Sequence, residues 1–197
     1  KICLNGEVIF VVSARDILRG RTRGDFKTAY DEESIRTILE LKKRGLVVQY
    51  AVISLLDSHK TIPAKVRLLE KKLKKLGIMA YRFFSINSYP KVNINPDELK
   101  INPFIDINKK IIAIISPGGG SGKFGVCLSQ LYHEMLNGVS PQYLKFETFP
   151  VHDLSIKHPL NLAYMAASAD FYDVVMKDKR HGRATSYNRD MENYELL

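Results

Sequence analysis

The chain has 197 residues, of which 45% are hydrophobic and 26% are charged. This composition is typical of a folded globular protein and excludes a disordered or fibrous one, and the length favours a single domain. No apolar run approaches the ~18 to 20 residues that cross a bilayer, and no charged-then-apolar leader precedes the first strand. The two cysteines, Cys3 and Cys127, give neither a metal-ligand spacing nor a disulfide framework. We therefore expect a cytoplasmic protein with no membrane partner.

The formal net charge of +9 is concentrated in the first half of the chain, where residues 1–100 hold 20 Lys and Arg against 11 Asp and Glu. Much of the excess lies in "KTIPAKVRLLEKKLKKLG", residues 60–77, in which four apolar residues recur at helical spacing. We interpret the basic residues around this stripe as the solvated face of an amphipathic helix. The alternative, a surface for nucleic acid or another phosphate-rich partner, is the less favoured interpretation.

Strand and helix patterns alternate along the first half of the chain. A continuous apolar and β-branched run over residues 7–14 predicts a buried strand, and residues 31–45 predict a helix with acidic residues in its first turn. Residues 46–55 predict the next strand. The basic helix then ends at Gly77, and residues 78–86 predict a third strand.

The pattern is less regular after the third strand. Residues 85–109 carry three prolines and five asparagines, so we interpret them as a long loop insertion with a short helical turn at "PDELK". Residues 109–116 predict a fourth strand, residues 121–138 a helix and residues 142–151 a fifth strand.

This alternation predicts an α/β fold with three layers, α-β-α, around a mostly parallel, P-loop-like or Rossmann-like sheet. We expect one domain over residues 1–197, in which residues 150–197 are less regular and contain a helix around residues 159–169. Because the chain opens on Lys1 without a Met and stops at "MENYELL", we expect it to be part of a longer protein.

The stretch "IIAIISPGGGSGKFG", residues 111–125, leads an apolar strand into a glycine-rich turn that ends in a lysine. Against the nucleotide-binding pattern G-x-x-x-x-G-K-[ST], Gly122 and Lys123 match, a proline replaces the first glycine, and Phe124 replaces the hydroxyl residue. A strand end, a glycine-rich turn and a helix N-terminus bring several backbone N–H groups onto one oxyanion. We therefore predict a degenerate P-loop at residues 117–123 that binds phosphate.

The predicted phosphate contacts come from five backbone N–H groups and one cation, namely Gly118, Gly119, Gly120, Ser121, Gly122 and Lys123. Side chains at the first three positions would stand between the N–H groups and the phosphate. The alternative is an ordinary tight turn, which would avoid the conformational entropy that three consecutive glycines lose on folding, so we favour anion binding. The candidate cofactor is ATP or another nucleotide, and a magnesium ion would need ligands from outside this loop.

Loops that follow the other parallel strands should lie at the same edge of the sheet, where ligands usually bind. The segment "SARDILRGRTRGD" supplies candidates for further anions, for a ribose hydroxyl or for a metal: Arg15, Arg19, Arg21, Arg23, Asp16 and Asp25. Of these we select Arg23 and Asp25 as the second-loop candidates, against the alternative of a basic solvated loop. In and after the fifth strand, Glu147 and His158 are the acid–base candidates, although one acid inside a strand is as often structural.

The segment "HEMLN" is similar to the zinc motif H-E-x-x-H, but Asn137 occupies the position of the second histidine. A lone His133 cannot hold the metal. We therefore predict no metal site.

Several longer runs resemble a family of uncharacterised bacterial proteins, domain of unknown function 1846. The runs are "SPGGGSGKFGVCLSQLYHEMLNGVSPQYLKFETFPVHDLSIKHPLNLAYMAASADFYDVVM", "YNRD" and "RGDFKTAYDEE". The family pattern has Ser-Gly-Lys without a following hydroxyl residue, matched by residues 121–123, and Phe-Glu-Thr-Phe-Pro, matched by residues 146–150. It also has His-Pro-x-Asn-Leu-Ala-Tyr, matched by residues 158–164, whereas His152 and Asp153 depart from it. The resemblance implies that the chain is the central α/β portion of longer members, and it supplies no reaction.

Together these observations predict a protein that binds a nucleotide or another phosphorylated small molecule at residues 117–123, with phosphate-directed hydrolase or transferase activity as an open extension. The alternative is a non-catalytic ligand-binding or scaffolding domain of a larger protein, for which the missing hydroxyl after Lys123 is the best support. The partner is then a phosphorylated small molecule rather than a nucleic acid. The sequence determines neither the ligand nor the oligomeric state.

Overall fold

The computed structural model describes residues 6–22, 27–57, 60–86, 96–143, 155, 157–159, 177–178 and 182–183. The chain forms two compact units, unit 1 from Lys1 to Pro141 and unit 2 from Gln142 to Leu197. Among the described residues, no helix has the length and apolar character needed to cross a bilayer.

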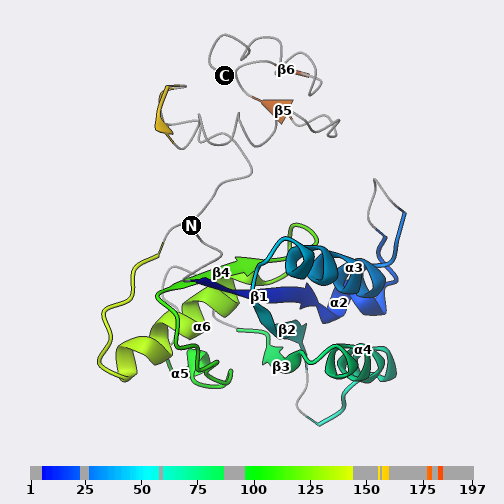
Figure 1. Ribbon diagram of the computed structural model, residues 1–197, viewed down its shortest axis with the longest axis horizontal. Coiled ribbons are helices and arrows are strands. Elements are labelled where there is room, and N and C mark those ends of the chain that lie inside the picture. Colours follow the sequence, from blue (N-terminus) through cyan, green and yellow to red (C-terminus); the bar gives the residue numbers. More distant parts are fainter. Residues whose placement is uncertain are drawn as a thin grey trace. The chain divides into compact units, whose positions relative to one another are not determined.

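Within its described residues, unit 1 contains a four-stranded sheet in the order β3-β2-β1-β4 (Figure 1). The strands are β1 (Gly6–Ser13), β2 (Val48–Leu56), β3 (Met79–Phe84) and β4 (Ile111–Ile115). All three pairings, β1 with β2, β1 with β4 and β2 with β3, are parallel. The carboxyl ends of the strands therefore lie at one edge of the sheet. This arrangement confirms the predicted α/β fold.

Strand β1 is buried along all of its length because it lies in the centre of the sheet with both faces covered. Its alternate side chains enter two different cores, as the period of a strand requires. Val8, Phe10 and Val12 pack into the larger core, whereas Ile9 and Val11 pack into the smaller one on the opposite face.

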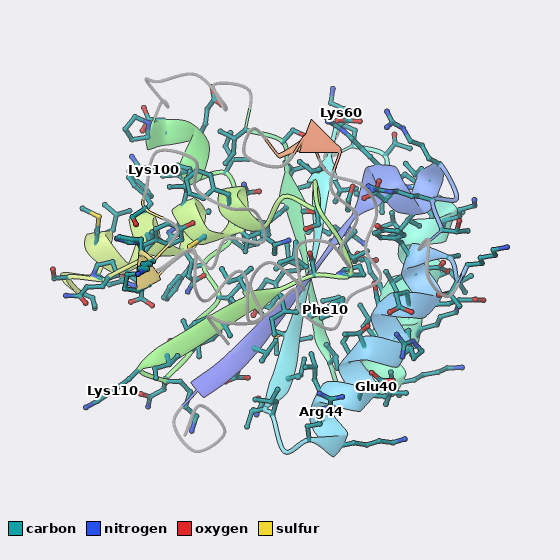
Figure 2. The ribbon with its side chains drawn as sticks, turned by 90° about the horizontal axis from the view of Figure 1, so that it is seen from above. Phe10, Glu40, Arg44, Lys60, Lys100 and Lys110 are labelled. Carbon is teal, nitrogen blue, oxygen red and sulfur yellow. The ribbon has the colours of Figure 1, made fainter. Side chains whose placement is uncertain are left out.

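Helices cover both faces of the sheet and give the three predicted layers. Helices α3 (Tyr30–Lys43) and α4 (Ala64–Lys75) pack Ile38, Leu69 and Leu73 into the larger core. Helix α6 (Lys123–Leu136) packs Val126 into the smaller core. Figure 2 shows α3 and α4 on one side of the strands and α6 on the other.

The boundaries of these helices follow the signals in the sequence. Helix α4 ends just before Gly77, whose φ of 70° lies in the left-handed region that glycine enters without steric cost. The buried residues of α4 are Val66, Leu69 and Leu73. The amphipathic helix predicted over this basic stretch is therefore confirmed.

The segment after β1 was predicted as a loop, and this prediction is wrong for its first residues. Helix α2 (Ala14–Leu18) follows β1 directly, and the side chain of Ser13 caps it by accepting from the backbone N–H of Asp16 at 3.2 Å. Five residues are too few to show a helical period, so only the serine cap could have indicated this helix.

The described part of the insertion at residues 85–109 packs on α6. It contains α5 (Pro96–Leu99), which confirms the helical turn predicted there. Ile105 is fully buried, and the side chain of Gln130 on α6 binds both its N–H, at 3.3 Å, and its carbonyl, at 2.7 Å. Ser129 donates to the carbonyl of Leu99 at 2.9 Å. These contacts fix the segment as part of the cover on the α6 face.

Two predictions for the C-terminal half fall largely outside the described residues. They are the fifth strand at residues 142–151, of which residues 144–151 are not described, and most of the helix expected around residues 159–169. In unit 2, β5 (Lys177–Asp178) and β6 (Gly182–Arg183) form an antiparallel pair.

Candidate functional site

The glycine-rich turn, residues 116–122, connects the carboxyl end of β4 to the first residue of α6, and we call it the glycine loop. Gly120 and Gly122 have φ values of 74° and 80°, which a residue with a side chain rarely adopts. Gly122 is the N-cap of α6, and no side chain caps this helix end. The first-turn N–H groups of α6 therefore have no side-chain acceptor at the cap, and the positive end of the helix dipole lies at the glycine loop.

Two glycines of the loop are required by close neighbours. A Cβ on Gly118 would lie 2.4 Å from Oη of Tyr30, the first residue of α3. A Cβ on Gly122 would lie 3.1 Å from Oγ of Ser54 on β2. The glycine loop thus passes close to both elements, which leaves room for backbone only.

Ser54 connects the glycine loop to the centre of the sheet. Its Oγ lies 2.5 Å from the carbonyl of Ser121 and 3.2 Å from the carbonyl of Val12, so the single hydroxyl proton is donated to one of them at a time. The next residue, Leu55, has a φ of 56°, a strained value for a side-chain-bearing residue, where the register of β2 and β3 shifts. Such strain is concentrated at functional sites in proteins.

Lys123 folds its side chain back onto the glycine loop. Its Nζ donates to Oγ of Ser116 at 2.7 Å and to the carbonyl of Gly118 at 3.3 Å. Burial lowers the pKa of this ammonium group, because the charged form loses hydration. Among the described residues, Lys123 forms no ion pair with a carboxylate. Its positive charge is therefore held by neutral oxygens.

A cavity of about 580 Å³ lies beside the glycine loop at the carboxyl edge of the sheet. Residues at or after the ends of three strands line it together with α6. Arg15 of α2 follows β1, Ser54 and Leu55 lie near the end of β2, and residues 83–86 lie at and just after the end of β3. The α6 side consists of residues 120–126. The convergence of strand ends, which the parallel topology predicts, thus forms a single pocket.

Arg15 provides a second cation at this pocket. Its Nη2 lies 2.6 Å from Oδ1 of Asp57, which follows β2, and donates to Oγ of Ser85, which follows β3, at 3.1 Å. The arginine and aspartate side chains are 44% and 70% exposed, so this ion pair adds little stability. The contacts of Arg15 instead position the strand ends relative to one another, because residues that follow three different strands meet at this one guanidinium group.

The other candidates of the segment after β1 lie in different surroundings. Asp16 is buried, with Oδ1 3.3 Å from Nη1 of Arg21, while among the described residues its Oδ2 has no hydrogen-bond partner. Arg21 also stacks over the ring of Tyr30 at 5.1 Å. Neither Asp16 nor Arg21 lines the pocket. Arg23 and Asp25 lie outside the described residues, so their membership of the site stays a prediction.

The acid–base candidates also stay predictions. Glu147 lies outside the described residues. His158 belongs to unit 2, where its backbone N–H donates to the carbonyl of Ser155 at 2.9 Å. Within the described part of the chain, no three or more His, Cys, Asp or Glu side chains form a group able to hold a metal ion.

The sequence did not single out Ser54, Leu55, Ser85 or Asn102 as pocket residues. The first three lie near or directly after a strand end, and Asn102 lies in the segment after α5. Local sequence patterns do not show which strand ends lie next to one another, so they could not identify these residues. The sequence marked Phe124 for the hydroxyl that it lacks, whereas the structure places this residue in the lining of the pocket.

Comparison with known proteins identifies the family. A family model described as "Domain of unknown function DUF1846, N-terminal" matches residues 1–197. The chain belongs to this family. The resemblance noted in the sequence is thereby confirmed, and the description assigns the match to the N-terminal part of the family, where the resemblance implied a central portion.

Bacterial relatives are similar to this chain over almost all of its length. The chain is 40% identical, over 97% of its length, to proteins described as "UPF0371 protein" from Streptococcus equi subsp. zooepidemicus and from Fusobacterium nucleatum subsp. nucleatum. A relative with the same description from Clostridium botulinum is also 40% identical over 97% of this chain. The chain spans 38 to 39% of the length of these three relatives.

Proposed function

We propose that this domain binds a nucleotide or another phosphorylated small molecule, with the phosphate at the glycine loop. The observation that carries the proposal is Lys123, a half-buried lysine whose Nζ is bonded to Ser116 and Gly118 within the loop itself. Burying a cation beside neutral oxygens costs hydration energy, and a bound phosphate would offset this cost. The uncapped N-terminus of α6 supports the same location for an anion.

Arg15 is the second cationic contact of the proposed site. It lines the same pocket as Lys123, and its partner Asp57 is 70% exposed. An exposed ion pair of this kind exchanges partners at little cost, so the guanidinium group can move from Asp57 to a phosphate oxygen. Arg15 is thus a candidate for the second cationic contact beside Arg23, which lies outside the described residues.

The proposal is tested by calorimetric titration of ATP, ADP and inorganic phosphate into the protein and into the Lys123→Ala variant. We expect Lys123→Ala to weaken binding roughly tenfold to a hundredfold, because a charge-assisted hydrogen bond contributes about 1.5 to 3 kcal/mol. The matched control is Lys110→Ala. Lys110 is an exposed lysine that precedes β4, whereas the glycine loop follows this strand. In Figure 2 Lys110 lies at the opposite end of the strands from Lys60. Unchanged binding in Lys123→Ala would refute the proposal.

A non-catalytic binding domain is the second candidate function, and Phe124 favours it. In the full nucleotide-binding motif the residue at this position supplies a hydroxyl ligand for magnesium, and a phenyl ring cannot. Titrations with and without magnesium, combined with an assay for released phosphate, separate the two candidates. Metal-independent binding without turnover supports the binding domain, whereas release or transfer of phosphate supports a hydrolase or transferase.

A further inference from the structure

The lining of the pocket consists of two parts that differ in polarity. One part is polar and cationic, formed by the glycine loop, Lys123 and Arg15. The other part is apolar, formed by Leu55, Phe84, Ile86 and Phe124. A site for inorganic phosphate or a small sugar phosphate needs no aromatic wall. The apolar part therefore favours a ligand that carries an apolar or aromatic group in addition to its phosphate.

Phe124 connects the two parts of the pocket. It follows Lys123 directly in the first turn of α6, and its side chain is 37% exposed. Helix α6 therefore contributes a cation and an aromatic ring to one pocket from successive positions. Phe124, which replaces the hydroxyl residue of the nucleotide-binding motif, thus lines the same pocket as Lys123.

The part of the lining at the end of β3 is held in place by a buried asparagine. Asn102 is 2% exposed, accepts from the backbone N–H of Phe84 at 2.6 Å, and donates to its carbonyl at 3.3 Å. The carbonyl of Asn102 itself lies 2.8 Å from Nε2 of His133 on α6. The helix that begins at the glycine loop thus also supports the segment that fixes the end of β3. Such a wall needs little rearrangement to receive a flat ring.

We propose that the pocket takes nucleoside phosphates, with the base held against Phe84, Ile86 and Phe124 while the phosphates lie at the glycine loop. This inference rests on the proposed function and narrows its ligand class from phosphorylated small molecules in general. The cavity volume of about 580 Å³ lies within the range of roughly 300 to 1,000 Å³ that is usual for small-molecule sites. Aromatic and apolar side chains recognise bases through their flat faces, which all bases share.

The test compares ADP with two ligands that carry phosphate but no base, ribose 5-phosphate and pyrophosphate, by calorimetric titration. We expect ADP to bind at least roughly tenfold more tightly than either, because stacking of one base contributes about 1 to 3 kcal/mol. Phe124→Ala should weaken ADP binding by roughly tenfold and leave pyrophosphate binding unchanged. Phe124→Leu, which keeps apolar volume without a ring, should weaken ADP binding to an intermediate degree, and Phe124→Tyr should retain it.

The control is Met135→Ala, which removes a 65% exposed side chain at the other end of α6 and should leave every affinity unchanged. If all three ligands bind equally and Phe124→Ala changes none of them, the nucleoside inference is wrong while the phosphate site stands. If Phe124→Ala weakens pyrophosphate as much as ADP, the ring supports the loop and the inference is also wrong. If no ligand binds, or Lys123→Ala leaves all binding intact, the proposed function fails and the inference fails with it.

Discussion

The two faces of the sheet are built differently, and the candidate pocket involves the cover of only one of them. On the face covered by α3 and α4, alternate residues of β1 and β2 meet regular amphipathic helices in one large core. On the α6 face the core is smaller, and the cover includes the segment around Ile105 as well as a helix. The pocket is lined by residues of this second cover together with Arg15 and the ends of β2 and β3. A regular helical layer covers one face, whereas the pocket forms where the composite layer meets the strand ends.

The largest expected effect is on the closed face. Leu69 on α4 is 1% exposed, so Leu69→Ala should lower the free energy of unfolding by about 2 to 5 kcal/mol through lost burial and a residual cavity. Leu68→Ala, on the same helix but 54% exposed, should change it by no more than about 0.5 kcal/mol. Urea denaturation measures both. Equal losses of stability in the two variants would mean that α4 does not bury the apolar side that contains Leu69.

The next effect is a pH dependence, also on the closed face. The side chain of Glu33 on α3 is fully buried, and the hydrogen bond from Arg36 is the main cause that lowers its pKa from 4.5 to about 2. Because the folded-state pKa is the lower one, ionised Glu33 stabilises the fold above about pH 5, and this contribution is lost as the pH falls toward 2. The loss amounts to at most about 3 kcal/mol. Unfolding measured from pH 7 to pH 2 should therefore be flatter in Glu33→Gln, and parallel curves would contradict the assignment.

On the pocket face, Asn102→Ala should have a smaller effect on stability and a clear one on the site. The substitution leaves the N–H and carbonyl of Phe84 without their side-chain partner, which costs on the order of 2 kcal/mol. Hydrogen exchange at the Phe84 amide should accelerate, and ADP should bind more weakly. Asn102→Asp keeps the acceptor and should recover part of the protection. Asn108→Ala, at an exposed asparagine in the same segment, is the control and should leave both properties unchanged.

The smallest effect expected on stability concerns the glycine loop itself. Gly118→Ala would place a methyl group 2.4 Å from Oη of Tyr30 and should destabilise the fold by about 1 to 2 kcal/mol. Gly119→Ala meets nothing within 4 Å and is the matched control in the same loop. Removing the hydroxyl with Tyr30→Phe should rescue part of the loss in the double variant. The same loss in both glycine variants would show that backbone freedom, and not the contact with Tyr30, requires Gly118.

Sequence reasoning succeeded where the signal is local. The strands and helices of unit 1 were predicted to within a few residues because their apolar periods and glycine stops are read over short windows. The glycine loop was found for the same reason, since its residues are consecutive. The short α2 was missed because five residues carry no period. A run of similar arginines also did not show that Arg15 lines the pocket, and Arg23 lies outside the described residues.

The sequence by itself determined the α/β class, the family and the glycine loop, because each depends on residues that are close together in the chain. Only the tertiary structure decided which strand ends lie side by side, and so brought Arg15, Ser54, Ser85 and Phe124 to one pocket. Strand order results from packing between segments far apart in sequence, and no local pattern encodes it. The aromatic ring that interrupts the phosphate-binding motif thus gained its place in the site from the fold.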